Sequence, residues 1–339
     1  MSHPHRFSVV LPVRNGGQYL QQCVASILAQ TYPHFDLIVL DNASTDGSLA
    51  WIRTLDDPRV RVYESAQSLN IEENWSRILS VPKQTWMTMT GHDDLFDPNY
   101  LDVMANLIDR HPDAGLYQAH FRLIDAQDQV IRHCVPMPES ERADAFLSRR
   151  LAFQRDSFGT GYVFRSADYE KIGGIPAYKK LMFADDALWM QLMLPSYKAT
   201  ASEECFAYRV HAQSTSYAPD WASVYDALKH YQMLLFSLAQ REVSVKGVLQ
   251  AQWTEYLIFW YQWAYFSTQD AREQACLRVV IQTWGVEVSD ALRKMGRQDA
   301  NQFLSDVQRQ VFSPVARYYW LGKRLWRWGI RRVRSGWAG

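Results

Sequence analysis

Apolar residues in the first hundred positions fall into short runs separated by longer amphipathic stretches. Four runs rich in β-branched and large apolar residues predict strands: Phe7–Leu11, Leu37–Leu40, Val60–Tyr63 and the stretch from Trp86 to the break at Gly91. Three stretches between them predict helices: Gly17–Gln30, Ser48–Leu55 and Ile71–Leu79. This alternation predicts an α/β fold with a parallel, doubly wound sheet and right-handed crossovers.

Beyond Pro98 the pattern becomes mixed. Further strands are expected at Gly115–Ile124, Gly161–Phe164 and Glu204–Val210, and helices at Ala143–Phe153 and Asp185–Leu194. From about Ala218 onward only helical periodicity, rich in aromatic residues, remains. We therefore expect a catalytic domain over residues 1–217 and an all-helical C-terminal region over residues 218–339.

Composition narrows the class of protein. With 339 residues, 47% of them hydrophobic and 21% charged, the chain is typical of a globular protein. Its net charge of zero argues against a general nucleic-acid binder. The four cysteines are far apart and form no C-x-x-C pair, which favours reduced thiols in a cytosolic protein. The polar start, Met1 to Arg6, predicts no secretory signal, and the apolar run Tyr256–Phe266 is too short to cross a bilayer.

The first candidate functional residues lie at the end of the fourth predicted strand. Asp93 and Asp94 stand side by side there, and ligands bind at the carboxyl ends of strands in open α/β sheets. Two adjacent carboxylates repel each other, and a divalent ion such as Mn²⁺ or Mg²⁺ that also holds substrate phosphates would compensate them. Taken alone, a solvated turn before a helix near Pro98 explains the same residues.

Five stretches considered together resemble a known family. They are Pro12-Val13-Arg14-Asn15, Asp41-Asn42-Ala43-Ser44-Thr45-Asp46-Gly47-Ser48, Gly91-His92-Asp93-Asp94 with Pro98, Asp185-Asp186-Ala187-Leu188-Trp189, and Tyr208-Arg209-Val210-His211. In this order and spacing they resemble the inverting family-2 glycosyltransferases, whose GT-A fold has a Rossmann-like, mostly parallel sheet. The resemblance covers roughly Phe7 to Ser216.

The resemblance implies a nucleotide-sugar donor. Its candidate binding residues are Pro12, Val13, Arg14, Asn15, Asp41, Asn42, Asn70, Asp93 and Gly161. Asn42 stands where the family commonly has a second Asp, and because an amide both donates and accepts hydrogen bonds, the identity of the nucleotide stays open. Gly91 stands where the family's first Asp of D-x-D-D often is.

The resemblance also implies the metal ligands and the base. Asp93, Asp94 and His211 would hold Mn²⁺ or Mg²⁺. Asp185 aligns with the catalytic base and Asp186 lies one place away, so either could fill the role; a single base on one face implies inversion. Acidic residues at a helix start also stabilise the helix dipole without any catalytic role.

Two other classes of protein stay open. Nucleotidyltransferases also hold Mg²⁺ with carboxylates on parallel sheets, although they usually have a Gly-rich loop and Lys after the first strand. A non-catalytic sugar-binding or scaffold protein with the same fold is the second alternative. The chain has no Q-x-x-R-W motif and no membrane span, which favours a non-processive enzyme over a polysaccharide synthase.

The C-terminal tail suggests a partner. After Asp306 there are eight Lys or Arg and no acidic residue. Wound as a helix, residues 313–337 place Tyr, Trp and Leu side chains on one face and most of the basic ones on the other, which is typical of a helix lying on an anionic membrane surface. A packed terminal helix or a protein-binding helix would explain it too. We expect a cytoplasmic, membrane-peripheral enzyme acting on a lipid-linked glycan, as in bacterial surface polysaccharide or lipopolysaccharide assembly.

Overall fold

The computed structural model describes residues 5–211, 220–268, 270–297, 299–313 and 315–316. The chain divides into two compact units, and each is described by itself. Unit 1 comprises Met1–Ala143 and Asp156–Tyr231, and unit 2 comprises Asp144–Arg155 and Gln232–Gly339. The domain boundary expected at residue 217 lies outside the described residues and stays a prediction.

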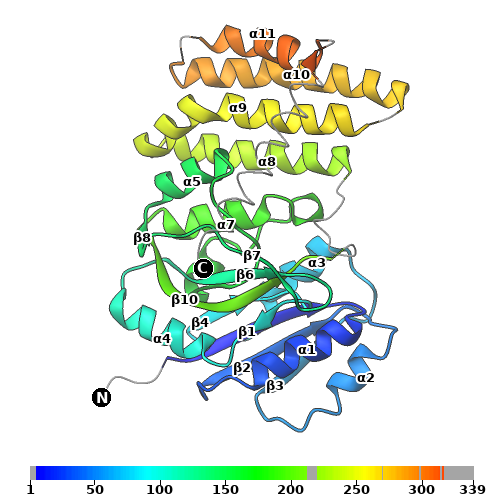
Figure 1. Cartoon of the computed structure of the whole chain (residues 1–339), viewed down its shortest axis with the longest axis vertical. Coiled ribbons are helices and arrows are strands. Elements are labelled where there is room, and N and C mark those ends of the chain that lie inside the picture. Colours follow the sequence, from blue (N-terminus) through cyan, green and yellow to red (C-terminus); the bar gives the residue numbers. More distant parts are fainter. Residues whose placement is uncertain (1–4, 212–219, 269, 298, 314, 317–339) are drawn as a thin grey trace. The chain divides into compact units, whose positions relative to one another are not determined.

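Unit 1 is built on one mixed sheet of ten strands (Figure 1). In chain order they are β1 (Phe7–Val13), β2 (Phe35–Asp41), β3 (Val60–Glu64), β4 (Trp86–Met89), β5 (Leu95–Phe96), β6 (Leu116–Ile124), β7 (Val130–His133), β8 (Ser140–Glu141), β9 (Tyr162–Arg165) and β10 (Lys198–Arg209). Eight strands follow the order β3-β2-β1-β4-β9-β6-β10-β5, while β7 pairs with β6 and β8 with β10. The pairs β1–β2, β2–β3, β1–β4 and β6–β10 are parallel, and β9 runs antiparallel to both β4 and β6.

Helices connect these strands. They are α1 (Gly17–Leu28), α2 (Ser48–Ile52), α3 (Ile71–Ser76), α4 (Tyr100–Arg110), α5 (Ala143–Leu151), α6 (Ser166–Lys171) and α7 (Ala184–Met193), with short 3₁₀ turns η1 (Arg77–Ser80) and η2 (Lys179–Leu181). Strand β1 is buried at all its positions, as expected of a parallel strand with both sheet faces covered. Val9 and Leu11 share a core with Leu20 of α1 and Met104 of α4.

The register of the parallel strands brings the predicted motifs together. Parallel pairing sets Val13 of β1 opposite Asp41 of β2, and Val10 of β1 opposite Met89 of β4. The carboxyl ends of three strands therefore meet at one edge of the sheet. The loops that follow them carry Asn15, Asn42 and Asp93, so the topology gathers the motifs there.

The sequence-based elements are confirmed in type, and the structure adds several that the pattern did not predict. Strand β10 begins at Lys198, six residues before the expected start, because register shifts between Ala201 and Phe206 interrupt its apolar alternation. Strands β5 and β8 have two residues each, too few for periodicity to reveal, and β7 and α6 were not predicted either. The helix expected over Ile71–Leu79 ends at Ser76 and continues as η1.

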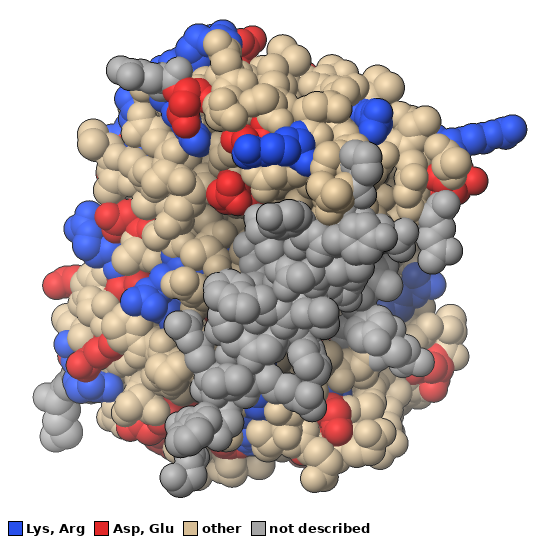
Figure 2. Space-filling model, turned by 45° about the horizontal axis from the view of Figure 1, so that its top comes forward, with Lys and Arg blue, Asp and Glu red and all other residues tan. Residues whose placement is uncertain are grey.

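Unit 2 is helical. Helix α5 belongs to it except for Ala143, and helix α8 (Trp221–Ala239) passes from unit 1 into it. Helices α9 (Val243–Ser267), α10 (Ala271–Lys294) and α11 (Ala300–Val311) complete its described part. Aromatic side chains form its core: the ring of Tyr261 lies 5.3 Å from that of Trp284 and 6.5 Å from that of Phe303. Among the described residues, none of the helices combines the length and apolarity that crossing a bilayer requires. On the face drawn in Figure 2, the described basic and acidic side chains are interspersed.

Candidate active site

The loops that follow β1 and β2, residues 13–17 and 41–48, are joined through polar side chains. Asn15 Oδ1 accepts a hydrogen bond from the backbone N–H of Thr45 at 2.7 Å. The N–H of Asn15 donates to Ser44 Oγ at 3.0 Å. We call these two segments the donor-side loops. Their polar groups hold each other in place, because each bond joins a backbone group to a side chain of the other loop.

The four residues predicted for nucleotide contact in the first loop differ in exposure. Pro12 and Val13 are buried within β1, whereas Arg14 and Asn15 are exposed. Asn15 has a φ of 53°, in the left-handed region that asparagine tolerates better than most residues. The turn thus presents Arg14 and Asn15 at the edge of the sheet, and their contact with a nucleotide stays a prediction.

The two carboxylate oxygens of Asp41 differ in their hydrogen bonding. The residue is fully buried, and its Oδ2 accepts from the N–H of Ser44 at 3.2 Å. Its Oδ1 is buried and has no hydrogen-bond partner among the described residues. Arg77 Nη1 donates to the Asp41 carbonyl oxygen at 2.8 Å. Burial lowers the pKa of Arg77, while the negative charge of Asp41 acts in the opposite direction. A buried acceptor without a partner is costly, so Asp41 Oδ1 is suited to an N–H or O–H donor of a ligand.

The side-chain amide of Asn42 binds the backbone of Leu69. Its Nδ2 donates to the carbonyl oxygen of Leu69 at 2.9 Å, and its Oδ1 accepts from the N–H of Leu69 at 2.7 Å. The amide is therefore matched to both polar groups of one residue, which a carboxylate could not do. Asn70, which follows Leu69 in the chain, caps α3. Its side chain accepts a hydrogen bond from the N–H of Glu73, and the Glu73 side chain accepts one from the N–H of Asn70. The structure thus gives both asparagines local structural contacts.

Asp93, Asp94 and His211, which we call the acidic cluster, come together although 118 positions separate its outer members. His211 Nε2 lies 2.9 Å from Asp93 Oδ2, and both side chains stay partly accessible. Asp94 points inward: its Oδ1 accepts from the N–H of Arg209 at 3.1 Å, and its Oδ2 is buried without a hydrogen-bond partner among the described residues. Of the predicted trio, Asp93 and His211 are brought into contact, whereas Asp94 faces the protein interior.

The interior side of the acidic cluster is unfavourable for negative charge. Burial raises the pKa of Asp94 well above its ordinary value, and the neighbouring Asp93 carboxylate raises it further. The hydroxyl of Thr160 and the N–H of Arg209 oppose this shift. Burial likewise raises the pKa of the Cys23 thiol, and the two aspartates add to the effect. Cys23 is thus a buried neutral thiol and no reactive nucleophile.

The glycine in the incomplete motif has a steric consequence. A Cβ at position 91 would lie 2.5 Å from Asp93 Oδ1. A side chain there would therefore displace the Asp93 carboxylate from its contact with His211. His92 is largely buried beside Gly16, and burial lowers its pKa although the charge of Asp93 opposes the shift. His92 is accordingly a neutral packing residue of this loop.

The predicted base lies in the first turn of α7. Asp185 is half-buried and its Oδ1 accepts from the N–H of Asp186 at 2.8 Å, whereas Asp186 is only 2% exposed. The residue before the helix, Phe183, has a left-handed φ of 59°. This sharp entry directs the first turn, and its geometry favours Asp185 over Asp186 as the more accessible carboxylate.

The loop Phe158–Gly161 links the two parts of the site. Thr160 affects the pKa of Asp94, and a Cβ at Gly159 would lie 3.8 Å from the Cβ of Asp185. The loop is fixed by its ends: the ring of Phe158 stacks on Tyr208 at 3.7 Å. At the other end a Cβ at Gly161, whose φ is +76°, would clash with Phe206 at 2.8 Å. Gly161 is thus required by the fold, and its contact with a donor stays a prediction.

A divalent ion fits this donor set. Across the described parts of the chain, no three His, Cys, Asp or Glu side chains converge closely enough to hold a metal by themselves. Mg²⁺ and similar hard ions, however, are often held by one or two carboxylates together with substrate phosphates. The partly accessible Asp93 carboxylate and His211 imidazole supply such a partial set.

Comparison with known proteins identifies the family. Residues 8–180, just over half of the chain, match the family described as glycosyl transferase family 2. The chain belongs to this family. A glycosyltransferase of Rickettsia typhi, RT0329, is 25% identical over 71% of this chain and 75% of its own length. The putative teichuronic acid biosynthesis glycosyltransferase TuaG of Bacillus subtilis is 24% identical over 62% of this chain and 81% of its own. With GlyG of Streptococcus pneumoniae, 30% identical, the match spans 36% of this chain but only 40% of GlyG.

Solved structures confirm the GT-A fold. Residues 1–349 of Staphylococcus aureus TarS, in complex with UDP-GlcNAc, superpose with a TM-score of 0.70 over 94% of this chain and 92% of that chain, at 14% identity. The mannosyltransferase PcManGT of Pyrobaculum calidifontis, in complex with GDP-Man and Mn²⁺, gives 0.51 over 90% of this chain and 87% of that chain, at 17% identity. The family-2 resemblance and the fold expected from the sequence are therefore both correct.

Sequence reasoning missed several residues that build the site. Arg77, Arg209, Tyr19 and Thr160 contact or influence the predicted residues, yet none was singled out. Arg209 could have been found, because it stands inside the quoted Tyr208–His211 motif. Tyr19 and Thr160 could have been found too, because Tyr19 continues the stretch that begins at Pro12 and Thr160 stands beside the candidate Gly161. Arg77 has no local pattern, and only the fold brings it to the sheet edge.

Proposed function

We propose that this family-2 glycosyltransferase is a metal-dependent, inverting, non-processive hexosyltransferase. It would move one sugar from a nucleotide-sugar donor to a hydroxyl of a glycan. The observation that carries the proposal is the shared loop Phe158–Gly161, which has the acidic cluster at Thr160 and Asp185 at Gly159. The residues that we assign to the departing diphosphate and to proton removal thus adjoin one short segment, which supports the proposal.

The donor side would recognise the nucleotide through Asp41. Its buried Oδ1, which has no hydrogen-bond partner among the described residues, accepts hydrogen bonds, so a base with an N–H donor or a ribose hydroxyl suits it. TarS binds UDP-GlcNAc and PcManGT binds GDP-Man, and uracil and guanine both carry such an N–H. Arg14 and Asn15 line the exposed rim of the same edge.

Charge at the diphosphate would be managed at the acidic cluster. Asp93 and His211, with Asp94 as a third candidate, would hold Mn²⁺ or Mg²⁺, which when bound stabilises negative charge on phosphate oxygens. Asp93 and His211 orient each other through their 2.9 Å contact. Asp185 would accept the proton of the acceptor hydroxyl as the new bond forms. Attack from the face opposite the leaving group inverts the anomeric centre.

A thermal-shift screen of nucleotide sugars, run with and without Mn²⁺, tests the donor and the metal together. We expect one UDP- or GDP-sugar to raise the melting temperature more with Mn²⁺ than without it. Proton NMR of the product of that donor then gives the anomeric configuration. Stabilisation that is independent of Mn²⁺, or a product that retains the donor configuration, would contradict the proposal. Nucleotidyl transfer would appear as release of inorganic pyrophosphate when a nucleoside triphosphate and a sugar 1-phosphate are supplied in place of the nucleotide sugar.

The acceptor and location follow from the sequence of the tail, which lies outside the described residues from position 317. We propose a lipid-linked glycan acceptor and a cytoplasmic enzyme held at an anionic membrane surface by its basic C-terminal segment. The relationship to TuaG, a putative teichuronic acid biosynthesis enzyme, supports a role in surface polysaccharide assembly. Sedimentation with anionic liposomes should pellet the full chain and spare a chain that ends at Phe312. Equal pelleting of both, or binding that ignores salt and lipid charge, would refute membrane attachment.

A further inference from the structure

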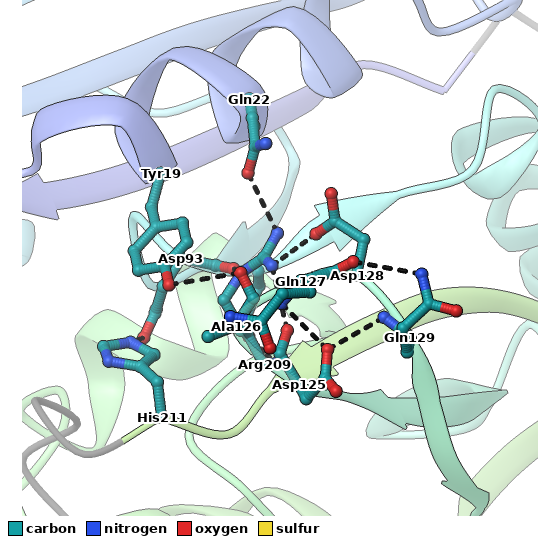
Figure 3. Close-up of polar contacts among 11 residues, drawn as sticks. Tyr19, Gln22, Asp93, Asp125, Ala126, Gln127, Asp128, Gln129, Arg209 and His211 are labelled. Atoms are coloured by element: carbon teal, nitrogen blue, oxygen red, sulfur yellow. Dashed lines mark hydrogen bonds and ion pairs between the residues drawn. The ribbon is translucent and has the colours of Figure 1, made fainter.

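Arg209 is a buried cation directly behind the acidic cluster (Figure 3). Its side chain is completely inaccessible, and its Nε donates to the carbonyl oxygen of Asp93 at 2.8 Å. Its Nη2 donates to Gln22 Oε1 of α1 at 3.1 Å, and its guanidinium lies 4.6 Å from the ring centre of Tyr19. The guanidinium thus fixes the backbone of a predicted metal ligand against α1.

The counter-charge comes from a turn that no motif identified. Asp128 lies between β6 and β7 and forms an ion pair and hydrogen bond with Arg209 Nη1, which also donates to the carbonyl oxygen of Asp125 at 3.1 Å. The turn is preformed, because Asp125 Oδ1 accepts from the N–H groups of Gln127 and Gln129. Asp128 has a left-handed φ of 63° and its side chain is 46% exposed. One carboxylate at the surface is therefore linked to a fully buried guanidinium.

Arg209 in turn contacts both aspartates of the acidic cluster. Its own N–H donates to Asp94 Oδ1, while its guanidinium holds the Asp93 carbonyl oxygen. The Tyr19 ring lies against the guanidinium and, at 5.0 Å, against the ring of His211. A rotation of the Arg209 guanidinium would therefore shift Asp93 directly and the His211 ring through Tyr19.

We propose that Asp128 is a positioning residue for divalent-ion binding: by pairing with Arg209 it holds Asp93 and His211 in the orientation that receives the ion. The inference rests on the proposed function, since it takes Asp93 and His211 as metal ligands. Asp128 itself does not touch the ion. Residues that hydrogen-bond a metal ligand directly typically change metal affinity about 10- to 100-fold when they are removed. Asp128 acts one contact further away, through Arg209, so we expect the lower end of this range.

The test measures metal binding apart from catalysis. Purified full-length protein is titrated with MnCl₂ in the presence of UDP and, separately, of GDP, and free Mn²⁺ is followed by its EPR signal. The variant is Asp128→Asn, which keeps the shape of the side chain and tolerates the left-handed backbone but removes the charge. Asp113→Asn, at an exposed carboxylate in the turn between α4 and β6, is the matched control. Urea unfolding of each protein reports stability.

We expect Asp128→Asn to raise the apparent Kd for Mn²⁺ about tenfold or more, and Asp113→Asn to leave it unchanged. Gln22→Leu, which removes the opposite acceptor of Arg209, should weaken Mn²⁺ binding in the same direction and decides the question if Asp128→Asn does not fold. Lowered stability with an unchanged Kd would overturn the inference and leave Asp128 a structural residue. A wild-type protein that binds no Mn²⁺ with either nucleotide would overturn the metal part of the proposed function, and this inference with it.

Discussion

The donor-side loops and the acidic cluster occupy the same edge of the sheet but use their polar groups in opposite ways. In the donor-side loops, Asn15 and Asn42 are matched to backbone groups of neighbouring segments. In the acidic cluster, Asp93 and Asp94 stand beside each other, and a buried oxygen of Asp94 has no hydrogen-bond partner among the described residues. The two asparagines are thus satisfied without a ligand, whereas Asp94 is not.

This difference separates residues that build a site from residues that serve it. An amide whose hydrogen bonds are all made stabilises the loop that contains it. Its loss should change the conformation of the donor-side loops. Adjacent buried carboxylates destabilise the folded chain, and such arrangements are concentrated at functional sites. Asp41 belongs with the second kind although it lies in a donor-side loop, because its Oδ1 is also buried and has no hydrogen-bond partner within the described part of the chain. Substitutions in the two groups should therefore have different signatures.

The largest effect is expected from Asp93→Ala. In the proposed function the Asp93 carboxylate holds the ion, and because it is partly accessible its loss should affect the core little. Metal-dependent transfer should therefore be abolished with little loss of fold. Initial rates across a range of Mn²⁺ concentrations, together with circular dichroism, measure both. Asp113→Ala, at an exposed turn, is the control. A mutant that keeps most of its activity and its response to Mn²⁺ would remove Asp93 from the metal site.

The second-largest loss of activity is expected from Asp185→Asn. Loss of a positioned base typically lowers turnover about 10²- to 10⁴-fold. Donor binding should survive, because Asp185 adjoins the loop at Gly159 and is not one of the candidate donor-binding residues. Single-turnover rates and donor affinity by calorimetry separate the two quantities. Asp186→Asn is the matched neighbour. If that variant shows the larger loss in turnover, the base is Asp186 and the mechanism stands; if neither matters, the proton leaves by another route.

A smaller effect is expected from Asn42→Asp, which introduces the family's more common residue. The carboxylate cannot donate to the Leu69 carbonyl oxygen, and it adds charge beside the buried Asp41. Leaving a buried group unsatisfied costs about 1–3 kcal/mol, so donor affinity should fall roughly tenfold while turnover at saturation changes little. Asn99→Asp, an exposed position with the same change in charge, serves as control. An unchanged or improved affinity would show that the Leu69 contact does not shape the donor pocket.

The smallest effect should come from Asn70→Ala. Removing a helix N-cap side chain typically costs about 1 kcal/mol of unfolding free energy, and Asn70 is exposed and engaged in the capping box of α3. Donor affinity should stay within about twofold of wild type, while urea unfolding shifts to lower concentration. A loss of affinity without a loss of stability would restore the nucleotide contact that the sequence suggested and place Asn70 with the residues that serve the ligand.

The sequence by itself determined the fold class, the order of the main strands and the stretches that form the site. This was possible because strands β1, β2 and β4 are nearly continuous apolar runs, and their ends carry polar motifs in a fixed order. Parallel pairing then brings those ends to one edge, so Asp41 and Asp93 could be assigned to one site before any coordinates. Local periodicity and motif spacing are properties of neighbouring residues, and a single sequence contains them.

Only the tertiary structure decided what each polar side chain does there. Asn42 and Asn70 are residues of the same kind in candidate positions, yet both make contacts that build loops and helix starts. Asp94 is adjacent to Asp93 in the chain but points to the interior, toward the N–H of Arg209. Asp128 carries no motif and becomes relevant because a turn places it on Arg209. Such roles depend on burial and on partners far along the chain, and these exist only once the sheet, its crossovers and its turns have formed.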